Sequence, residues 1–189
     1  MLTITPQDEA KLRVLKSLSE VEQQQVLEVL AKYHHNQANL DSNRRADQLL
    51  GSSFTQEERL DLEIESLAKA FEHRRRLLSD TVTAPKVAEI LNTSRQTPHD
   101  RVKAQTLLAV MDNGALRFPL WQFLPEGSDG VLPGFPQVLK ALQLSDFAKL
   151  SWLVRPNPYL EGLTPVEALK NGLVERVLQE AKAAGHGQD

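Results

Sequence analysis

From residue 83 onward the hydrophobic and polar positions predict two short helices separated by a tight corner. Thr83 can cap the first helix, Pro85 suits its opening turn, and apolar residues then recur at helical spacing. Residues 92–93 form the corner, and Ser94 is expected to cap the second helix. Two helices joined by so short a corner are typical of a helix-turn-helix.

Two apolar runs follow, Leu108–Met111 and Ala115–Phe118, with Asn113-Gly114 between them. Asn-Gly between apolar runs is the strongest short-range signal for a two-residue β-hairpin. A hairpin directly after a helix-turn-helix is a wing. We therefore expect a winged helix-turn-helix over residues 80–122.

The N-terminal region, residues 1–79, is predicted to be helical from residue 6 to about 78. Ser19-Glu22 and Thr55-Glu58 fit the Ser/Thr-x-x-Glu capping box that starts helices, and residues 36–51 form a looser connection. The later helix carries apolar residues at heptad-like spacing: Leu60, Ile64, Leu67, Phe71 and Leu78. This pattern favours equally a dimer contact and packing on the helix over residues 20–36.

Residues 123–189 are predicted to form a small helical bundle after a loop rich in proline and glycine at 123–134. One helix is expected over 136–144 and another from the Ser145 cap to Val154, where the prolines that follow end it. Thr164-Pro165-Val166-Glu167 predicts a new helix start, and the last helix spans about 173–184. The fold class is thus mainly α, with one short β-hairpin.

The amino-acid composition excludes several kinds of functional site. The 189 residues include no cysteine, which excludes disulfides and Cys-ligated zinc, and the adjacent His34 and His35 diverge on a helix instead of forming a chelating pair. No phosphate-binding glycine loop or nucleophile motif is present, so we expect no catalytic residue, no metal and no cofactor. Without a long apolar run or a leader-like N-terminus, a cytoplasmic location and no membrane partner are expected.

The net charge of −3 is unevenly distributed. Residues 81–122 carry five Lys or Arg against three Asp or Glu, a net +2, whereas the segments on either side are acidic. Affinity for DNA follows the local field, so this segment is the candidate for contact with double-stranded DNA. Because the excess is small, two copies acting together are expected, which favours a homodimer on a two-fold operator.

On a helix that begins after Ser94, Pro98, at its fourth position, faces the core together with Val102 and Gln105, while Gln96, Asp100 and Lys103 face outward. Gln, Lys and Arg are suited to base edges and phosphates. The candidate DNA-binding residues are Arg95, Gln96, Thr97, His99, Lys103, Asn113 and Arg117. The alternative is that they form an ordinary solvated helix face.

The C-terminal part carries a more specific pattern. Trp152-Leu153 ends one helix, and Asn157, Leu160 and Gly162 precede the Thr-Pro-x-Glu-Ala-Leu run at 164–169. Together with 118–123, 130–142 and 172–178, these residues resemble the toxin-binding domain of Xre/MbcA/ParS-type bacterial antitoxins. The resemblance covers about a third of the chain. It implies a helical domain that docks on a RES-type toxin, an enzyme that degrades nicotinamide dinucleotide, while a DNA-binding domain represses the operon.

The region before that domain departs from the resemblance, because such antitoxins commonly carry a Cro-like helix-turn-helix, whereas this chain has an excisionase-like winged module. Three functions stay open: a DNA-binding regulator of antitoxin type, an adaptor that binds proteins through both ends, and a toxin-neutralising protein whose winged module is only a scaffold. The candidate partner-binding residues are Arg155, Asn157, Tyr159 and Glu167.

Overall fold

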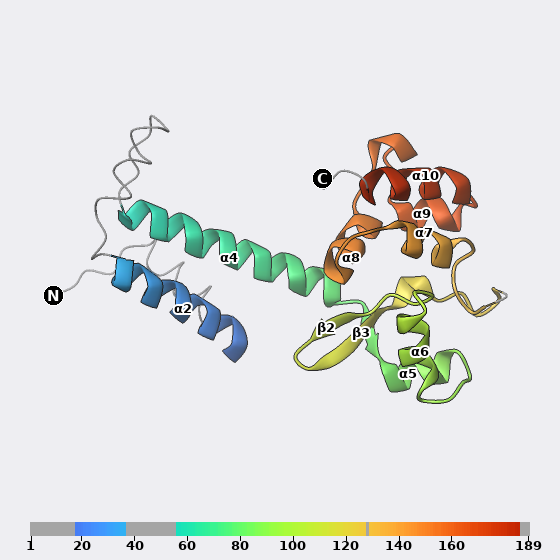
Figure 1. The fold of residues 1–189 in the computed structure, drawn as a ribbon, viewed down its shortest axis with the longest axis horizontal. Helices are drawn as coiled ribbons and strands as arrows, with labels where there is room; N and C mark the ends of the chain where they lie inside the picture. The colour runs from blue at the N-terminus through green and yellow to red at the C-terminus, as the bar shows by residue number, and fades with distance from the viewer. Residues whose placement is uncertain (1–17, 37–55, 128, 186–189) are drawn as a thin grey trace. The chain divides into compact units, whose positions relative to one another are not determined.

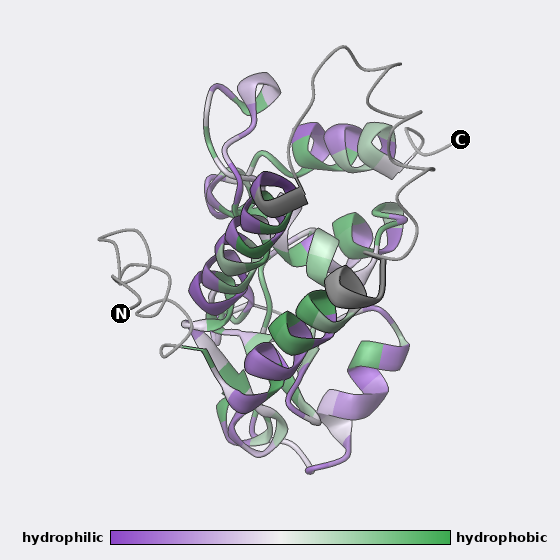
Figure 2. Ribbon diagram, turned by 90° about the vertical axis from the view of Figure 1, so that its left-hand side faces the viewer, coloured by the Kyte–Doolittle hydropathy of each residue, from purple (hydrophilic) through white to green (hydrophobic). Residues whose placement is uncertain are grey.

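The computed structural model describes residues 18–36, 56–127 and 129–185. The chain divides into two compact units, residues 1–75 and 76–189. Both are mainly helical in their described parts, and a small antiparallel sheet lies in the second (Figure 1). Figure 2 shows that most helices contain both hydrophobic and hydrophilic residues. The expected fold class is confirmed.

The first unit contains α2 (Glu20–Asn36) and most of α4 (Gln56–Leu78). The predicted capping box at Ser19 is present, because the Ser19 N–H donates to a Glu22 carboxylate oxygen at 2.8 Å and the Glu22 N–H donates to the Ser19 hydroxyl at 3.4 Å. The box predicted at Thr55 and the segments 6–17 and 37–55 lie outside the described residues.

The heptad-like pattern of α4 is used within the first unit. Phe71, 7% exposed, packs with Leu18 and Val26, and Leu67 packs against the same cluster. Arg75 adds an ion pair with Glu22 at 3.1 Å. Of the two interpretations of the pattern, packing on the preceding helix therefore holds at Leu67 and Phe71.

The second unit begins with a helix-turn-helix, α5 (Ala84–Ile90) followed by α6 (Thr97–Lys103). Thr83 occupies the N-cap of α5 as expected, although its side chain makes no capping hydrogen bond. The corner follows from Asn92, whose left-handed φ of 49° reverses the chain. The N–H of Thr93 then donates to the Ala88 carbonyl at 2.9 Å, which closes the end of α5 as a Schellman motif.

The wing is the hairpin of β2 (Val110–Asp112) and β3 (Ala115–Pro119), and it turns at Asn113-Gly114 as predicted. Both turn residues have positive φ, 47° and 76°, as a type I′ turn requires. A strand that the sequence pattern did not indicate, β1 (Thr81–Thr83), pairs antiparallel with β3. The sheet order is β1-β3-β2, so the hairpin is tied to the segment that leads into α5.

The C-terminal bundle consists of α7 (Phe135–Ala141), α8 (Asp146–Val154), α9 (Pro165–Lys170) and α10 (Val174–Gly185). The 3-10 turns η1 (Leu120–Gln122) and η2 (Pro158–Leu160) lie before and within it. Ser145 caps α8 and Thr164 caps α9, both as predicted. Within the second unit these helices gather on one side of the sheet, opposite α5 and α6 (Figure 1).

One hydrophobic core runs through most of the second unit. Leu108 and Val110 of the winged module are buried in the same cluster as Phe135, Leu153 and Leu169 of the bundle. A smaller cluster, which includes Ala84, Val87, Leu107, Phe118 and Val131, lies under the helix-turn-helix. The described residues of 80–122 and of 123–185 therefore pack together as parts of one compact unit.

Candidate nucleic-acid interface

The second helix of the helix-turn-helix begins later than the sequence pattern predicts. Ser94 does not cap it; α6 starts at Thr97, after a turn in which the Thr97 N–H donates to the Ser94 carbonyl at 3.1 Å. The reason is Pro98, which lacks an N–H and therefore lies in the first turn, where no intrahelical bond is lost. Pro98 is the second helical residue instead of the fourth.

The inner face of α6 is shorter than expected. Pro98 is buried and Val102 packs against the helix-turn-helix core, but Gln105 is exposed. The helix ends at Lys103, and Gln105 takes a left-handed φ of 54° just beyond the C-cap. The N–H of Thr106 donates to the Arg101 carbonyl at 2.9 Å, so Gln105 forms a Schellman end and not a core contact.

The outer face of α6 is polar and exposed. His99, Asp100 and Lys103 are spaced so that they share one side of the helix, and all three are exposed. Arg95 and Gln96, in the preceding turn, are exposed as well. This outer face of residues 95–103 is the surface that a major groove would meet.

Within the described part of the chain, the basic side chains of this face have no partners. Arg95, His99 and Lys103 make no hydrogen bond or ion pair among the residues that the structure describes. Lys86, by contrast, is paired with Glu89 at 2.8 Å, and this hydrogen bond and charge lower the pKa of Glu89. The unpaired cations of the helix-turn-helix thus gather at residues 95–103.

Two side chains of the same face, Gln96 and Thr97, already form hydrogen bonds with neighbouring residues. The Gln96 amide Nε2 donates to an Asp100 carboxylate oxygen at 3.1 Å, which holds that carboxylate among the cations. The Thr97 hydroxyl lies 3.0 Å from the Ser94 hydroxyl, and Thr97 is only half-exposed. Gln96 retains its carbonyl oxygen and one N–H for a base edge, whereas Thr97 is placed to stabilise the turn.

The two candidate DNA-binding residues of the wing, Asn113 and Arg117, differ in whether their side chains are available to a ligand. Asn113 is exposed at the tip of the hairpin. Arg117 is half-buried, and its guanidinium donates to the Thr81 hydroxyl at 3.1 Å and to the Thr81 carbonyl at 3.4 Å. Arg117 therefore fastens β3 to the segment that enters α5, and Asn113 is the wing residue left open to a ligand.

The candidate partner-binding residues lie around η2 in the bundle. Asn157 is structural, because its side-chain oxygen accepts the Tyr159 N–H at 2.8 Å and its amide donates to Glu180 at 3.3 Å. Tyr159 is 75% exposed. Its carbonyl accepts from Arg176 at 3.0 Å, and Arg176 also pairs with Glu161 at 2.7 Å. These hydrogen bonds hold the loop, and Tyr159 is exposed to solvent.

Arg155 and Glu167 are both exposed, but they differ in what they already bind. Glu167 accepts the Thr164 N–H and the Thr164 hydroxyl, each at 2.8 Å, in the capping box of α9. These bonds lower the pKa of Glu167. Arg155 makes no side-chain hydrogen bond or ion pair among the described residues, so Arg155 and Tyr159 are the two free candidates on this surface.

The sequence pattern did not single out two polar residues that organise this unit. Gln122 is fully buried between the winged module and the bundle, and Arg101 leaves the inner side of α6 to reach the 124–132 loop. A glutamine within an otherwise apolar run, Phe118 to Phe123, was the available signal for Gln122. Nothing in the spacing distinguishes Arg101 from its exposed neighbours.

Comparisons with known proteins define no family for this chain. No family model matches it, and no curated protein matches it. Among solved structures the chain is similar to one described as the NMR structure of Rv2175c, with 25% identity and a TM-score of 0.49. The similarity covers 56% of this chain and 81% of that one, and at this TM-score it carries no argument about function.

No described helix combines the length and apolarity that crossing a bilayer requires.

Proposed function

We propose that this chain is a DNA-binding regulator that places the outer face of residues 95–103 in the major groove. The observation that carries the proposal is the set of exposed, unpaired basic side chains Arg95, His99 and Lys103. They lie on or just before α6, which Pro98 and Val102 anchor to the core. Because no ion pair within the described residues has to be broken first, these side chains are available to phosphates and to guanine.

Binding by a single copy is expected to be weak. The outer face carries Asp100 beside its cations, and the helix-turn-helix segment has a net charge of only +2. Two copies on a two-fold site would double the phosphate contacts, so we propose that the active form is a homodimer. Light scattering of the protein with and without bound duplex measures that stoichiometry.

The experiment starts with selection of duplexes from a random library and with the region upstream of the chain's own gene. Fluorescence anisotropy then compares the wild type with Arg95→Ala and Gln96→Ala, and with Lys140→Ala as the matched control. Lys140 is an exposed cation of α7 in the bundle. We expect the first two variants to lose about tenfold or more in affinity, as for side chains at base edges, and the control to retain it. Absence of salt-sensitive binding contradicts the proposal and favours the protein adaptor.

We propose further that the bundle binds a protein, with Tyr159 and Arg155 at the centre of the contact. Exposed Tyr and Arg are the residue types that are enriched at binding hot spots, and the hydrogen bond from the Tyr159 N–H to Asn157 orders the η2 loop before a partner binds. By its resemblance to antitoxins, the partner is a RES-type toxin. Co-expression with the product of the neighbouring gene tests this, with growth rescue and co-purification lost in Tyr159→Ala and kept in Lys140→Ala.

A further inference from the structure

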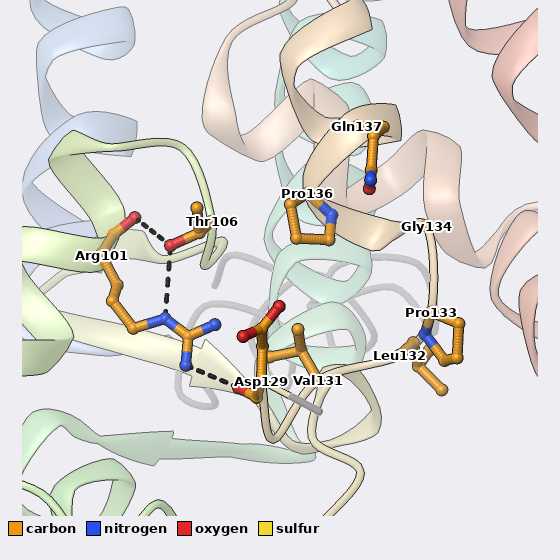
Figure 3. Close-up of a pocket in the computed structure, with 9 residues that line it drawn as sticks. All are labelled: Arg101, Thr106, Asp129, Val131, Leu132, Pro133, Gly134, Pro136 and Gln137. Carbon is orange, nitrogen blue, oxygen red and sulfur yellow. Dashed lines mark hydrogen bonds between the residues drawn. The ribbon is translucent and has the colours of Figure 1, made fainter. Parts of the chain in front are cut away.

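A pocket of about 540 Å³ lies behind α6, between the helix-turn-helix and the start of α7. Figure 3 shows Arg101 and Thr106 on one side of it, Pro133 to Gln137 on the other, and the Asp129 carboxylate between the two. Pockets of about 300–1,000 Å³ are the usual size for small-molecule ligands.

Arg101 presents an incompletely satisfied cation to this pocket. Its Nε donates to the Thr106 hydroxyl at 3.3 Å, and one terminal nitrogen donates to the Asp129 carbonyl at 2.9 Å. A guanidinium has five N–H donors, so three are left. Among the described residues no carboxylate lies within ion-pair distance of Arg101, although burial lowers its pKa.

The other residues that line the pocket favour a ligand that carries a positive charge and an apolar group in addition to a negative charge. The Asp129 carboxylate is exposed, accepts no hydrogen bond from a described residue, and is near enough to raise the pKa of Arg101. A doubly charged anion such as phosphate would meet this negative charge, whereas a cationic group would be attracted to it. Val131, Leu132 and Pro136 supply apolar walls, and the Gln137 amide can donate and accept.

We propose that this pocket binds a small zwitterion, an α-amino acid or a dipeptide with an apolar side chain. The ligand's carboxylate meets the free N–H donors of Arg101, and its ammonium group meets the Asp129 carboxylate. Planar guanidinium and carboxylate groups form strong paired hydrogen bonds, which fixes the orientation of the ligand. The site rests on its own geometry and not on the proposed DNA binding.

The test uses the full chain without DNA. Two-dimensional amide NMR spectra are recorded during titration with L-leucine and the dipeptide Leu-Leu, then with N-acetyl-L-leucine, L-leucinamide and inorganic phosphate. We expect L-leucine or Leu-Leu to shift the amides of Arg101, Asp129 and Gln137 selectively. Each blocked form, which lacks one charge, is expected to bind about tenfold more weakly or worse, because a hydrogen bond to a charged group is lost.

The variant Asp129→Asn distinguishes binding in this pocket from nonspecific binding. It is expected to fold, because no described residue donates a hydrogen bond to the Asp129 carboxylate. The variant should lose affinity for L-leucine about tenfold while its affinity for N-acetyl-L-leucine is unchanged or higher. Asp146→Asn, an exposed change at the start of α8, is the control and should bind as the wild type does. Tighter binding of phosphate than of either zwitterion, no selective shifts, or equal binding of the blocked forms would overturn the proposal.

Discussion

The side-chain amide of Gln122 pairs with the backbone of Leu108 through both of its ends. Its Oε1 accepts the Leu108 N–H at 2.9 Å, and its Nε2 donates to the Leu108 carbonyl at 2.9 Å and to the Pro119 carbonyl at 3.0 Å. Gln122 is 0% exposed, and Leu108 belongs to the core that the winged module shares with the bundle. One side chain thus satisfies backbone groups at the point where the two parts meet.

Gln122→Leu should therefore destabilise the second unit strongly. The change leaves the Leu108 N–H and two carbonyl groups buried without these partners, and each such group costs about 1–3 kcal/mol. We expect a loss of about 3 kcal/mol in the free energy of unfolding, measured by urea denaturation. Gln179→Leu, on the exposed side of α10, is the control and should change that free energy by less than about 0.5 kcal/mol. A loss in Gln122→Leu no larger than in the control would show that the pairing is dispensable.

Alanine substitutions at Gly134 and Gly172 distinguish the cost of backbone strain from the cost of a steric clash. Both have left-handed φ, 75° and 77°. A Cβ on Gly134 would collide with the Val174 side chain of α10, whereas a Cβ on Gly172 meets nothing within 4 Å. Gly172→Ala should cost about 1–2 kcal/mol from conformation alone, and Gly134→Ala clearly more. Thermal unfolding of the two variants measures the difference, and equal losses would mean that Val174 moves aside freely.

Asp100 is expected to limit nonspecific binding by the outer face of residues 95–103. Asp100→Asn removes a negative charge from this face but retains an acceptor for Gln96. Affinity for an arbitrary duplex should rise by about tenfold at low salt, and the preference for the selected sequence should fall. Anisotropy titrations with both duplexes measure this. Unchanged nonspecific affinity would place Asp100 away from the phosphates.

Because of Glu167, the bundle should become less stable as the pH falls into the acidic range. The pKa of Glu167 is lower in the folded chain, chiefly because of the hydrogen bond from the Thr164 N–H. The stabilisation is therefore present above the ordinary glutamate pKa, about 4.3, and is lost as the pH falls through the lower folded pKa.

Glu167→Gln keeps an acceptor for the capping box but cannot ionise. The difference in Tm between the wild type and this variant should be largest near neutral pH and should shrink toward pH 3. Thr164→Val, which removes the hydroxyl donor, should show a weaker acid dependence than the wild type. A wild-type advantage that is constant from pH 7 to pH 3 would contradict this role of the carboxylate.

Local signals predicted the α-helices and the hairpin of the second unit, because each such signal depends on only a few neighbouring residues. Asn113-Gly114 produced the expected hairpin, and Ser145 and Thr164 started helices where the pattern placed them. The start of α6 was predicted wrongly because two local signals competed, and the position of Pro98 prevailed over the capping preference of Ser94. Strand β1 was not predicted, because three residues next to a helix cap carry no alternation of their own.

The candidate site was harder to predict than the fold. The sequence identifies Arg95, Arg101 and Arg117 as cations of one segment, but only the packing shows that Arg101 and Arg117 are bound by the 124–132 loop and by Thr81. Such hydrogen bonds join residues 28 and 36 positions apart. A spacing rule confined to one helix cannot detect them.

The central claim, that the outer face of residues 95–103 contacts DNA, is tested most directly by the salt dependence of binding in Lys103→Ala. Each phosphate contact contributes a slope of about −0.9 to log K against log[salt]. With the selected duplex, Lys103→Ala should therefore have a slope shallower by about 1 per copy bound than the wild type, while Lys140→Ala keeps the wild-type slope. Identical slopes for all three proteins would contradict the claim.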